Sequence, residues 1–317
     1  MVVKKYIVLS LSLLCFSACS QQTEKQANTT KMNTETITSQ NFVSKVLEHV
    51  KHYDKEPTYW LNIYKKAGLE IYVNDMPVFK AFDDRKYSTG ASINYMILKS
   101  GEQKIKYRIE SKEKEVYIGI EVVEIDNKGA MKVADEKMIK NYEKTIQMPA
   151  NGVYEEEFTF TAEVPYENKG WSDGQDLRKL DKDRLQKAVV AYYQKMWDIY
   201  NDKSKKEKQF PLILEREIAI SEYSSRKKLE TILQELLFPF TDDTYKIQPL
   251  ENYKMVFYGY GKLVGLEQTS MDIRLRGGSA LWAKYKYENS TTIADYTQIL
   301  LYLPPGKKLE DGLQIIR

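Results

Sequence analysis

The stretch NKGWSDGQDLRKLDKDRLQKAVVAYYQKMWDIY, residues 168–200, divides the chain into two parts of different character. Residues 168–176 are rich in Gly and Asp, which predicts a boundary between domains. From Leu177 to Tyr200 apolar residues recur every three or four positions, and this spacing predicts a helix of roughly seven turns. Strand-like periodicity dominates before the boundary, whereas helices and strands are mixed after it. The sequence therefore predicts an α+β fold.

Residues 67–167, before this boundary, predict a β-sandwich-like domain. Apolar and polar residues alternate from Leu69 and stop at Asn74-Asp75, which is a turn signal. Ser100-Gly101-Glu102 lies between two β-prone runs and predicts a hairpin. Short strands separated by turn signals, with no convincing helix among them, are typical of a β-sandwich. The other predicted strands are residues 92–98, 104–109, 115–125, 144–148 and 156–164.

Residues 41–66 predict a helical segment in front of the sandwich. The apolar residues of its first half lie at helical spacing and favour an amphipathic helix over residues 41–54. An aromatic cluster around Tyr59 and Tyr64 follows Pro57. The residues that carry the helical spacing are Phe42, Val43, Val46, Leu47, Val50 and Tyr53.

Residues 168–317 predict an α+β domain in which helices pack on a curved antiparallel sheet. A second helix is expected over residues 225–237, and Pro239 is expected to end it. The architecture is similar to that of the nuclear-transport-factor-2-like and cystatin-like folds, although no motif supports the comparison. The strands expected in this domain are residues 245–250, 254–266, 271–276, 280–287, 291–303 and 313–315.

Composition excludes several classes of function. The chain has 317 residues, 48 Lys and Arg against 45 Asp and Glu, two Cys and two His. A formal net charge of +3 is too small to indicate a nucleic-acid partner. The scarcity of Cys and His excludes a disulfide framework, most zinc sites and most nucleophile–His pairs.

The N-terminus predicts a targeting segment. Lys4 and Lys5 precede an apolar run over residues 6–16, which is too short to span a bilayer. The sequence Phe16-Ser17-Ala18-Cys19 then resembles a bacterial lipoprotein lipobox, with Phe where Leu is usual. The resemblance implies that residues 1–18 are a signal peptide and that Cys19 is acylated, by palmitate among other chains. An ordinary secretory signal with a free Cys19 is the alternative.

The resemblance also implies a location. Acyl chains on Cys19 would anchor the protein in a lipid bilayer at the cell envelope, on the periplasmic or surface face of an outer membrane. Residues 20–40 are polar and have almost no apolar residue, so we expect residues 19–40 to form a disordered tether. Such a coil spans roughly 25 Å.

The histidines and glycines do not form recognised sites. His49 and His52 share a helical face, but neither Cys nor a further His is available as a third ligand, so we expect no metal. Gly259-Tyr260-Gly261 continues to Gly265, one residue too far for a dinucleotide-binding motif, so we expect no cofactor.

Carboxylates beside an aromatic residue are the best candidates for sugar chemistry. Asp173 and Asp176 lie next to Trp171, and an aromatic ring near carboxylates can contact a sugar. A capping turn before the long helix explains both carboxylates equally well. We therefore assign these three residues to weak binding and predict no catalytic residue.

The chain is rich in tyrosine, with 24 Tyr against 10 Phe. Tyr258 and Tyr260 are expected on one face of a long strand, and Tyr285 and Tyr287 on one face of the next. Four tyrosines on one sheet face would form either a wall of the core or an exposed binding platform. The core is the favoured interpretation, and the four residues are kept as weak binding candidates.

These observations predict a non-enzymatic binding module that is anchored in the envelope. Its partner would be another protein or a glycan, and an immunity-type protein that blocks a secreted toxin is one specific form. A carboxylate-based glycan hydrolase or a glycan-binding protein is a second class. A structural or assembly lipoprotein, which recruits envelope components through its sheet edges, is a third class.

Overall fold

A computed structural model describes residues 36–128, 136–212, 216–287 and 291–316. Within these ranges 15 strands form four antiparallel sheets beside a few helices, which confirms the predicted α+β fold. The signal peptide, Cys19 and most of the predicted tether lie outside the described residues. The last residues of that tether are held in place, since Ser39 N donates to Glu207 Oε2 at 2.8 Å. None of the described helices is long and apolar enough to cross a membrane.

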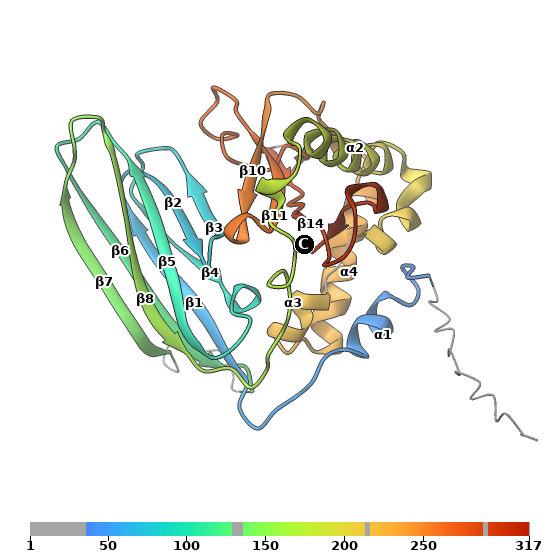
Figure 1. The fold of residues 1–317 in the computed structure, drawn as a ribbon, viewed down its shortest axis with the longest axis horizontal. Coiled ribbons are helices and arrows are strands. Elements are labelled where there is room, and N and C mark those ends of the chain that lie inside the picture. The colour runs from blue at the N-terminus through green and yellow to red at the C-terminus, as the bar shows by residue number, and fades with distance from the viewer. Residues whose placement is uncertain (1–35, 129–135, 213–215, 288–290, 317) are drawn as a thin grey trace, which may run out of the picture. The chain divides into compact units, whose positions relative to one another are not determined.

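Two four-stranded sheets form the predicted sandwich, whose strands appear as two layers in Figure 1. Sheet A has the order β4-β1-β6-β7, and sheet B has the order β3-β2-β5-β8. The bounds are β1 (Pro57–Lys65), β2 (Gly68–Val73), β3 (Met76–Ala81), β4 (Tyr87–Ser92), β5 (Gly101–Glu110), β6 (Glu115–Asp126), β7 (Lys137–Gln147) and β8 (Val153–Ala162).

Alternation of side chains builds the sandwich core. In β5 every second residue from Gln103 to Ile109 is buried, and the residues between them are at least partly exposed. Leu61 of sheet A and Ile71 of sheet B are both fully buried and belong to one hydrophobic cluster. The inner faces of the two sheets therefore share one core.

The N-terminal segment and the loop before β5 differ from their predicted structures. Helix α1 covers only Phe42–Leu47, and the aromatic cluster lies in β1, where burial alternates with a period of two. The predicted strand over residues 92–98 contains the short 3₁₀ helix η1 (Asn94–Met96). No hairpin forms around Ser100, because β5 pairs with β2 and β8.

Helices and two small sheets make up the C-terminal part. The helices are α2 (Lys182–Tyr200), α3 (Arg216–Ser221) and α4 (Arg226–Thr241). Tyr193 ties α2 to a sheet, since its hydroxyl accepts from Leu266 N and donates to Ile299 O. The sheets are β10-β11-β14-β15, with β10 (Tyr253–Tyr258), β11 (Leu263–Gln268), β14 (Leu301–Tyr302) and β15 (Gln314–Ile315), and β13-β12-β9, with β9 (Lys246–Ile247), β12 (Trp282–Lys286) and β13 (Thr292–Tyr296).

Several local predictions for this part are wrong. The long helix begins at Lys182 rather than at Leu177, and the predicted strand over residues 291–303 is divided between β13 and β14. Helix α4 continues through Pro239 to Thr241, because the missing N–H falls in the last turn and costs one bond. The predicted strand over residues 254–266 is the hairpin β10–β11, since Gly259, Tyr260 and Gly261 all have positive φ and reverse the chain. Residues 271–276 form a turn, in which Asp272 accepts from the backbone N–H of Arg274.

The N-terminal helix α1 packs against the C-terminal helices rather than against the sandwich. Phe42 of α1 packs against Phe210 with 5.7 Å between ring centroids, and both are buried with Leu229 of α4. Figure 1 shows α1 beside α3 and α4. Residues Thr36–Arg317 accordingly form one compact unit.

Candidate functional site

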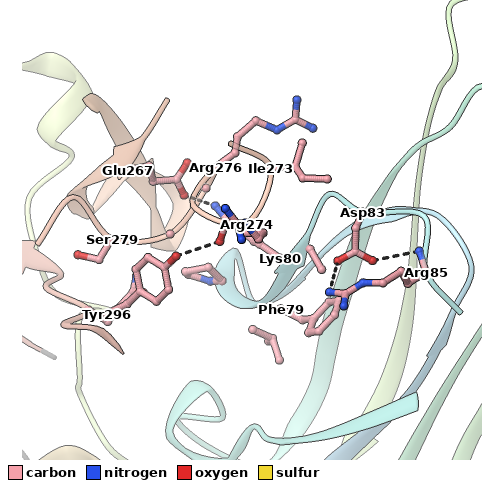
Figure 2. A pocket seen from close by; sticks show the side chains of 16 residues that line it. Phe79, Lys80, Asp83, Arg85, Glu267, Ile273, Arg274, Arg276, Ser279 and Tyr296 are labelled. Carbon is pink, nitrogen blue, oxygen red and sulfur yellow. Dashed lines mark hydrogen bonds and ion pairs between the residues drawn. The ribbon is translucent and has the colours of Figure 1, made fainter. Parts of the chain in front are cut away.

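A cleft of about 350 Å³ runs along β3 and is closed on its other side by residues 273–279 (Figure 2). All of residues 77–81 line it. Successive side chains of a strand point to opposite faces, so a cavity lined by every residue of the run lies along the strand's edge. Strand β3 is the end strand of sheet B and pairs with β2 through its other edge. We call this cavity the β3 cleft.

The far wall of the β3 cleft is a turn that is fixed by local hydrogen bonds. Asp272 accepts from the backbone and side chain of Arg274, and Tyr296 Oη donates to Arg274 O at 2.9 Å. Gly277 has a φ of +77°, and a Cβ at this position would lie 2.7 Å from the Phe82 ring. Glycine is therefore required where this turn approaches the sandwich.

Arginines stand on both sides of the opening. Arg85 pairs with Asp83 at 3.1 Å and Arg274 with Asp272 at 2.6 Å, and both arginine side chains are largely exposed. Arg276 lies over the Phe82 ring, with 4.0 Å from Cζ to the centroid. Figure 2 places Arg85 across the opening from Arg274. The ion pair with Asp272 uses N–H groups of Nε and Nη2 of Arg274. A guanidinium carries five N–H donors, so this pair does not use all of them.

The floor of the cleft is a buried ionic network. Lys80 of β3 forms an ion pair with Glu267 of β11, and the Tyr258 hydroxyl donates to the same carboxylate. The Lys80 ammonium also lies 5.2 Å from the ring centroids of both Tyr72 and Tyr258. Burial, followed by the charge of Glu267, raises the pKa of Tyr258, so its phenol stays protonated as a donor. This network joins β3 of the sandwich to the C-terminal sheet.

A second buried pair holds the loop that carries Arg85. Lys65 Nζ donates to Asp83 Oδ1 at 3.1 Å and to Asp83 O at 2.7 Å. The hydrogen bond from Arg85, together with that from Lys65, lowers the pKa of Asp83 to about 2, although burial opposes the shift. Asp83 is therefore ionised at neutral pH and positions the Arg85 guanidinium.

The two carboxylates that line the cleft are both engaged in ion pairs. A carboxyl with a pKa near 2 cannot act as a general acid at neutral pH, and the Glu267 carboxylate is already engaged by Lys80 and Tyr258. Among the described residues no group of three or more His, Cys, Asp or Glu side chains could hold a metal ion. His52, one of the two histidines considered for a metal, contacts Glu56 Oε1 at 2.8 Å.

Four of the residues chosen from the sequence meet at the β10–β11 turn, and of these only Tyr258 also reaches the cleft, through its hydrogen bond to Glu267 in the floor. Trp171 is buried beneath the turn, and a Cβ on Gly259 would lie 2.7 Å from its ring. Asp176 caps the 3₁₀ helix η3 (Leu177–Lys179) and binds Arg178 at 2.8 Å, whereas Asp181 caps the long helix α2. Tyr258 lies at the N-terminal end of the turn and Tyr260 within it. These contacts are structural.

The remaining candidates do not form a tyrosine face. Tyr258 is buried in the sheet of β10, whereas Tyr285 belongs to the sheet of β12 and packs on Phe238 at 5.1 Å. Tyr260 has a φ of +60° and is 52% exposed, which removes it from the face of Tyr258. Tyr287 lies just beyond β12 and is exposed. Asp173 is exposed and lines a separate surface pocket with His49. The expectation that these four tyrosines share one sheet face, whether as a wall of the core or as a platform, is therefore wrong.

The cleft residues gave a weak signal in the sequence. The turn contains the sequence RLRGG, residues 274–278. Met271, Ile273 and Leu275 alternate with polar residues, and this alternation led to the prediction of a strand. Asp272 followed by a Gly-Gly pair is a turn signal that outweighs this alternation. No local pattern links residues 77–81 to residues 273–279, because the pairing depends on tertiary structure.

Comparison of the chain with models of protein families, with curated proteins and with solved structures finds no match.

Proposed function

We propose that this chain is a non-enzymatic binding protein, lipid-anchored at the bacterial cell envelope, that captures an extended acidic segment of a partner protein in the β3 cleft. The observation that carries the proposal is the position of the cleft along the outer edge of an end strand. An extended peptide can pair with such an edge through main-chain hydrogen bonds, and its alternate side chains then enter the flanking pockets.

Charge favours an acidic segment. The side chains that line the cleft include four cations, Lys80, Arg85, Arg274 and Arg276, and two carboxylates, Asp83 and Glu267. Lys80 and Glu267 neutralise each other in the floor, which leaves the arginines at the opening as the groups a partner meets first. Guanidinium groups bind carboxylates in bidentate geometry.

Anchoring is supported by the lipobox-like sequence at Cys19 and by the polar tether that follows it. The tether would hold the cleft near the membrane and still let it reach a partner. An immunity-type protein, whose partner is a secreted toxin, is one protein that would act in this way.

Selection from a random peptide library displayed on phage, with residues 36–317 as bait, tests the proposal. We expect enriched peptides to be β-prone and rich in Asp and Glu. Methylation of alternate backbone amides of a selected peptide should abolish its binding, because those amides pair with β3.

A matched pair of variants separates the cleft from general electrostatics. Arg274→Glu should weaken binding of the selected peptides by about tenfold or more. Arg226→Glu changes the charge equally on the exposed first turn of α4 and should leave binding unchanged. Peptides without an acidic bias, or equal binding to both variants, would contradict the proposal.

A further inference from the structure

A second cavity, of about 730 Å³, lies on the outer face of sheet A, away from the β3 cleft. Its centre is one row of the sheet, in which Ser88 of β4, Tyr64 of β1, Gly119 of β6 and Glu143 of β7 lie side by side. Cross-strand neighbours in a row are about 5 Å apart, so these residues form a continuous strip across the sheet. We call this cavity the Tyr64 groove.

Two half-exposed tyrosines and a glycine shape the groove. Tyr64 is 40% exposed and Tyr117 is 46% exposed, on neighbouring strands. A Cβ on Gly119 would lie 3.1 Å from Tyr64 Cδ2 and 3.4 Å from Tyr117 Oη. The missing side chain lets both rings approach the sheet, and it leaves a depression between aromatic walls.

Hydrogen-bonding groups lie beside the rings. Tyr64 Oη donates to Glu121 Oε2 at 3.3 Å, and Asn62 Nδ2 lies 3.4 Å from the same oxygen. Burial, and after it the nearby carboxylate of Glu143, which is exposed, raises the pKa of the Tyr117 phenol. Each carboxylate has more acceptor sites than these contacts use. The groove thus offers acceptors next to aromatic faces.

The charges of the groove balance. Glu121 and Glu143 line the groove together with Lys66 and Lys86, which are exposed. Lys65 also lines the groove, but it is paired with Asp83. A strongly charged ligand of either sign would therefore meet repulsion as well as attraction.

We propose that the Tyr64 groove binds a neutral oligosaccharide built from hexose units. The apolar C–H face of a pyranose ring suits the negatively charged face of an aromatic ring, and sugar hydroxyls suit carboxylate acceptors. A volume of 730 Å³ lies in the range of small-molecule sites and holds a few sugar rings. The groove and the β3 cleft have no lining residue in common.

Isothermal titration calorimetry with a panel of neutral hexasaccharides of glucose, mannose, galactose and N-acetylglucosamine tests this site. We expect at least one member to bind, and Tyr64→Ala and Tyr117→Ala each to weaken that member by about tenfold. Tyr64→Phe keeps the ring and should bind within about threefold of wild type.

Tyr260→Ala removes an equally exposed tyrosine elsewhere and should leave sugar binding unchanged. Thermal unfolding confirms that each variant is folded. Absence of binding for the whole panel at millimolar concentration would overturn the proposal. Equal binding by wild type and a Tyr64→Ala, Tyr117→Ala double variant would overturn it as well, and so would sugar binding that the selected acidic peptides displace.

Discussion

The ammonium of Lys65 lies 3.1 Å from Oδ1 of Asp83, and only 2% of the Lys65 side chain is exposed. Lys65 is the last residue of β1 and is buried, whereas Asp83 belongs to the loop after β3. The pair therefore fixes the position of the loop that brings Arg85 to the β3 cleft.

Replacement of Asp83 by Asn should destabilise the fold by about 3 kcal/mol, because it leaves the buried Lys65 charge without a counter-ion. The backbone carbonyls of Ala67 and Asp83 still accept from Lys65, which keeps the loss at the lower end of the usual range. Asp84→Asn, at the exposed neighbour, should change the free energy of unfolding by less than about 0.5 kcal/mol. Urea denaturation measures both, and equal stability of the two variants would contradict the role of the pair.

The same pair predicts an acid response. The pKa of Asp83 is about 2 in the folded protein and has its ordinary value of 3.8 in the unfolded chain. The unfolded state therefore binds the proton first, so the stability from this group is present above about pH 4 and is lost as pH falls toward 2. The stability difference between wild type and Asp83→Asn should shrink over this interval.

Glu156 should be a further centre of stability in the sandwich. Its Oε2 accepts from Lys144 Nζ at 2.6 Å and from the hydroxyls of Tyr107, Tyr142 and Tyr154 at 2.6–2.8 Å. Burial raises its pKa, but these bonds outweigh burial and lower the pKa to about 2. Glu156→Gln should cost about 2 kcal/mol, because the charge-assisted bonds are lost.

Glu157 provides the control for Glu156. Its side chain is 56% exposed and forms a surface pair with Lys104. Glu157→Gln should therefore cost less than about 1 kcal/mol. A similar loss of stability in both variants, measured by urea denaturation, would show that the network around Glu156 adds nothing beyond a surface ion pair.

The sequence predicted the fold class and the sandwich but missed the strands at its margins. Period-two alternation identified the centres of β2, β5, β6 and β8, where one face is buried. It failed at β1, which follows a helical pattern, and at β3 and β4, over which no strand was predicted. Pro77 is compatible with β3 because β3 is an end strand.

Because Gly259 lies close to Trp171, the addition of one methyl group at Gly259 should strongly destabilise the fold. Gly259 has a φ of +56°, and a Cβ would lie 2.7 Å from Trp171 Cδ1, so Gly259→Ala should cost about 3 kcal/mol. Gly306 has a φ of +73°, and no atom would lie within 4 Å of a Cβ at this position. Gly306→Ala should therefore cost only about 1 kcal/mol. Because both glycines have positive φ, the difference in thermal unfolding midpoint between the Gly259→Ala and Gly306→Ala variants measures the steric cost at Gly259. Equal midpoints would contradict such a cost.

Lipid anchoring predicts a difference between the two cysteines. Cys19→Ser should abolish incorporation of radiolabelled palmitate and move the protein from the membrane fraction to the soluble fraction. Cys15→Ser alters only the segment expected to be cleaved and should leave labelling unchanged. Palmitate incorporation into the Cys19→Ser protein would refute the anchor.

The candidate site was less predictable than the fold for a physical reason. Its two walls lie almost 200 residues apart in the sequence, on the edge of β3 and on the turn that follows β11. Trp171 and Asp176 were chosen from the sequence as an aromatic and an acidic residue, yet packing accounts for the first and capping for the second. Tyr258 was chosen for a tyrosine face, but its hydroxyl instead binds Glu267 in the floor of the cleft. Position at a sheet edge, which only the tertiary structure gives, identifies the cleft.

Amide hydrogen exchange, measured with and without a selected acidic peptide, tests the central claim most directly. Strand addition predicts that exchange slows in β3, where peptide carbonyls accept from backbone N–H groups on its outer edge. The amides of β1, in the other sheet, should keep their exchange rates. A bound peptide that leaves β3 unprotected, or that protects a different strand, would contradict capture at this edge.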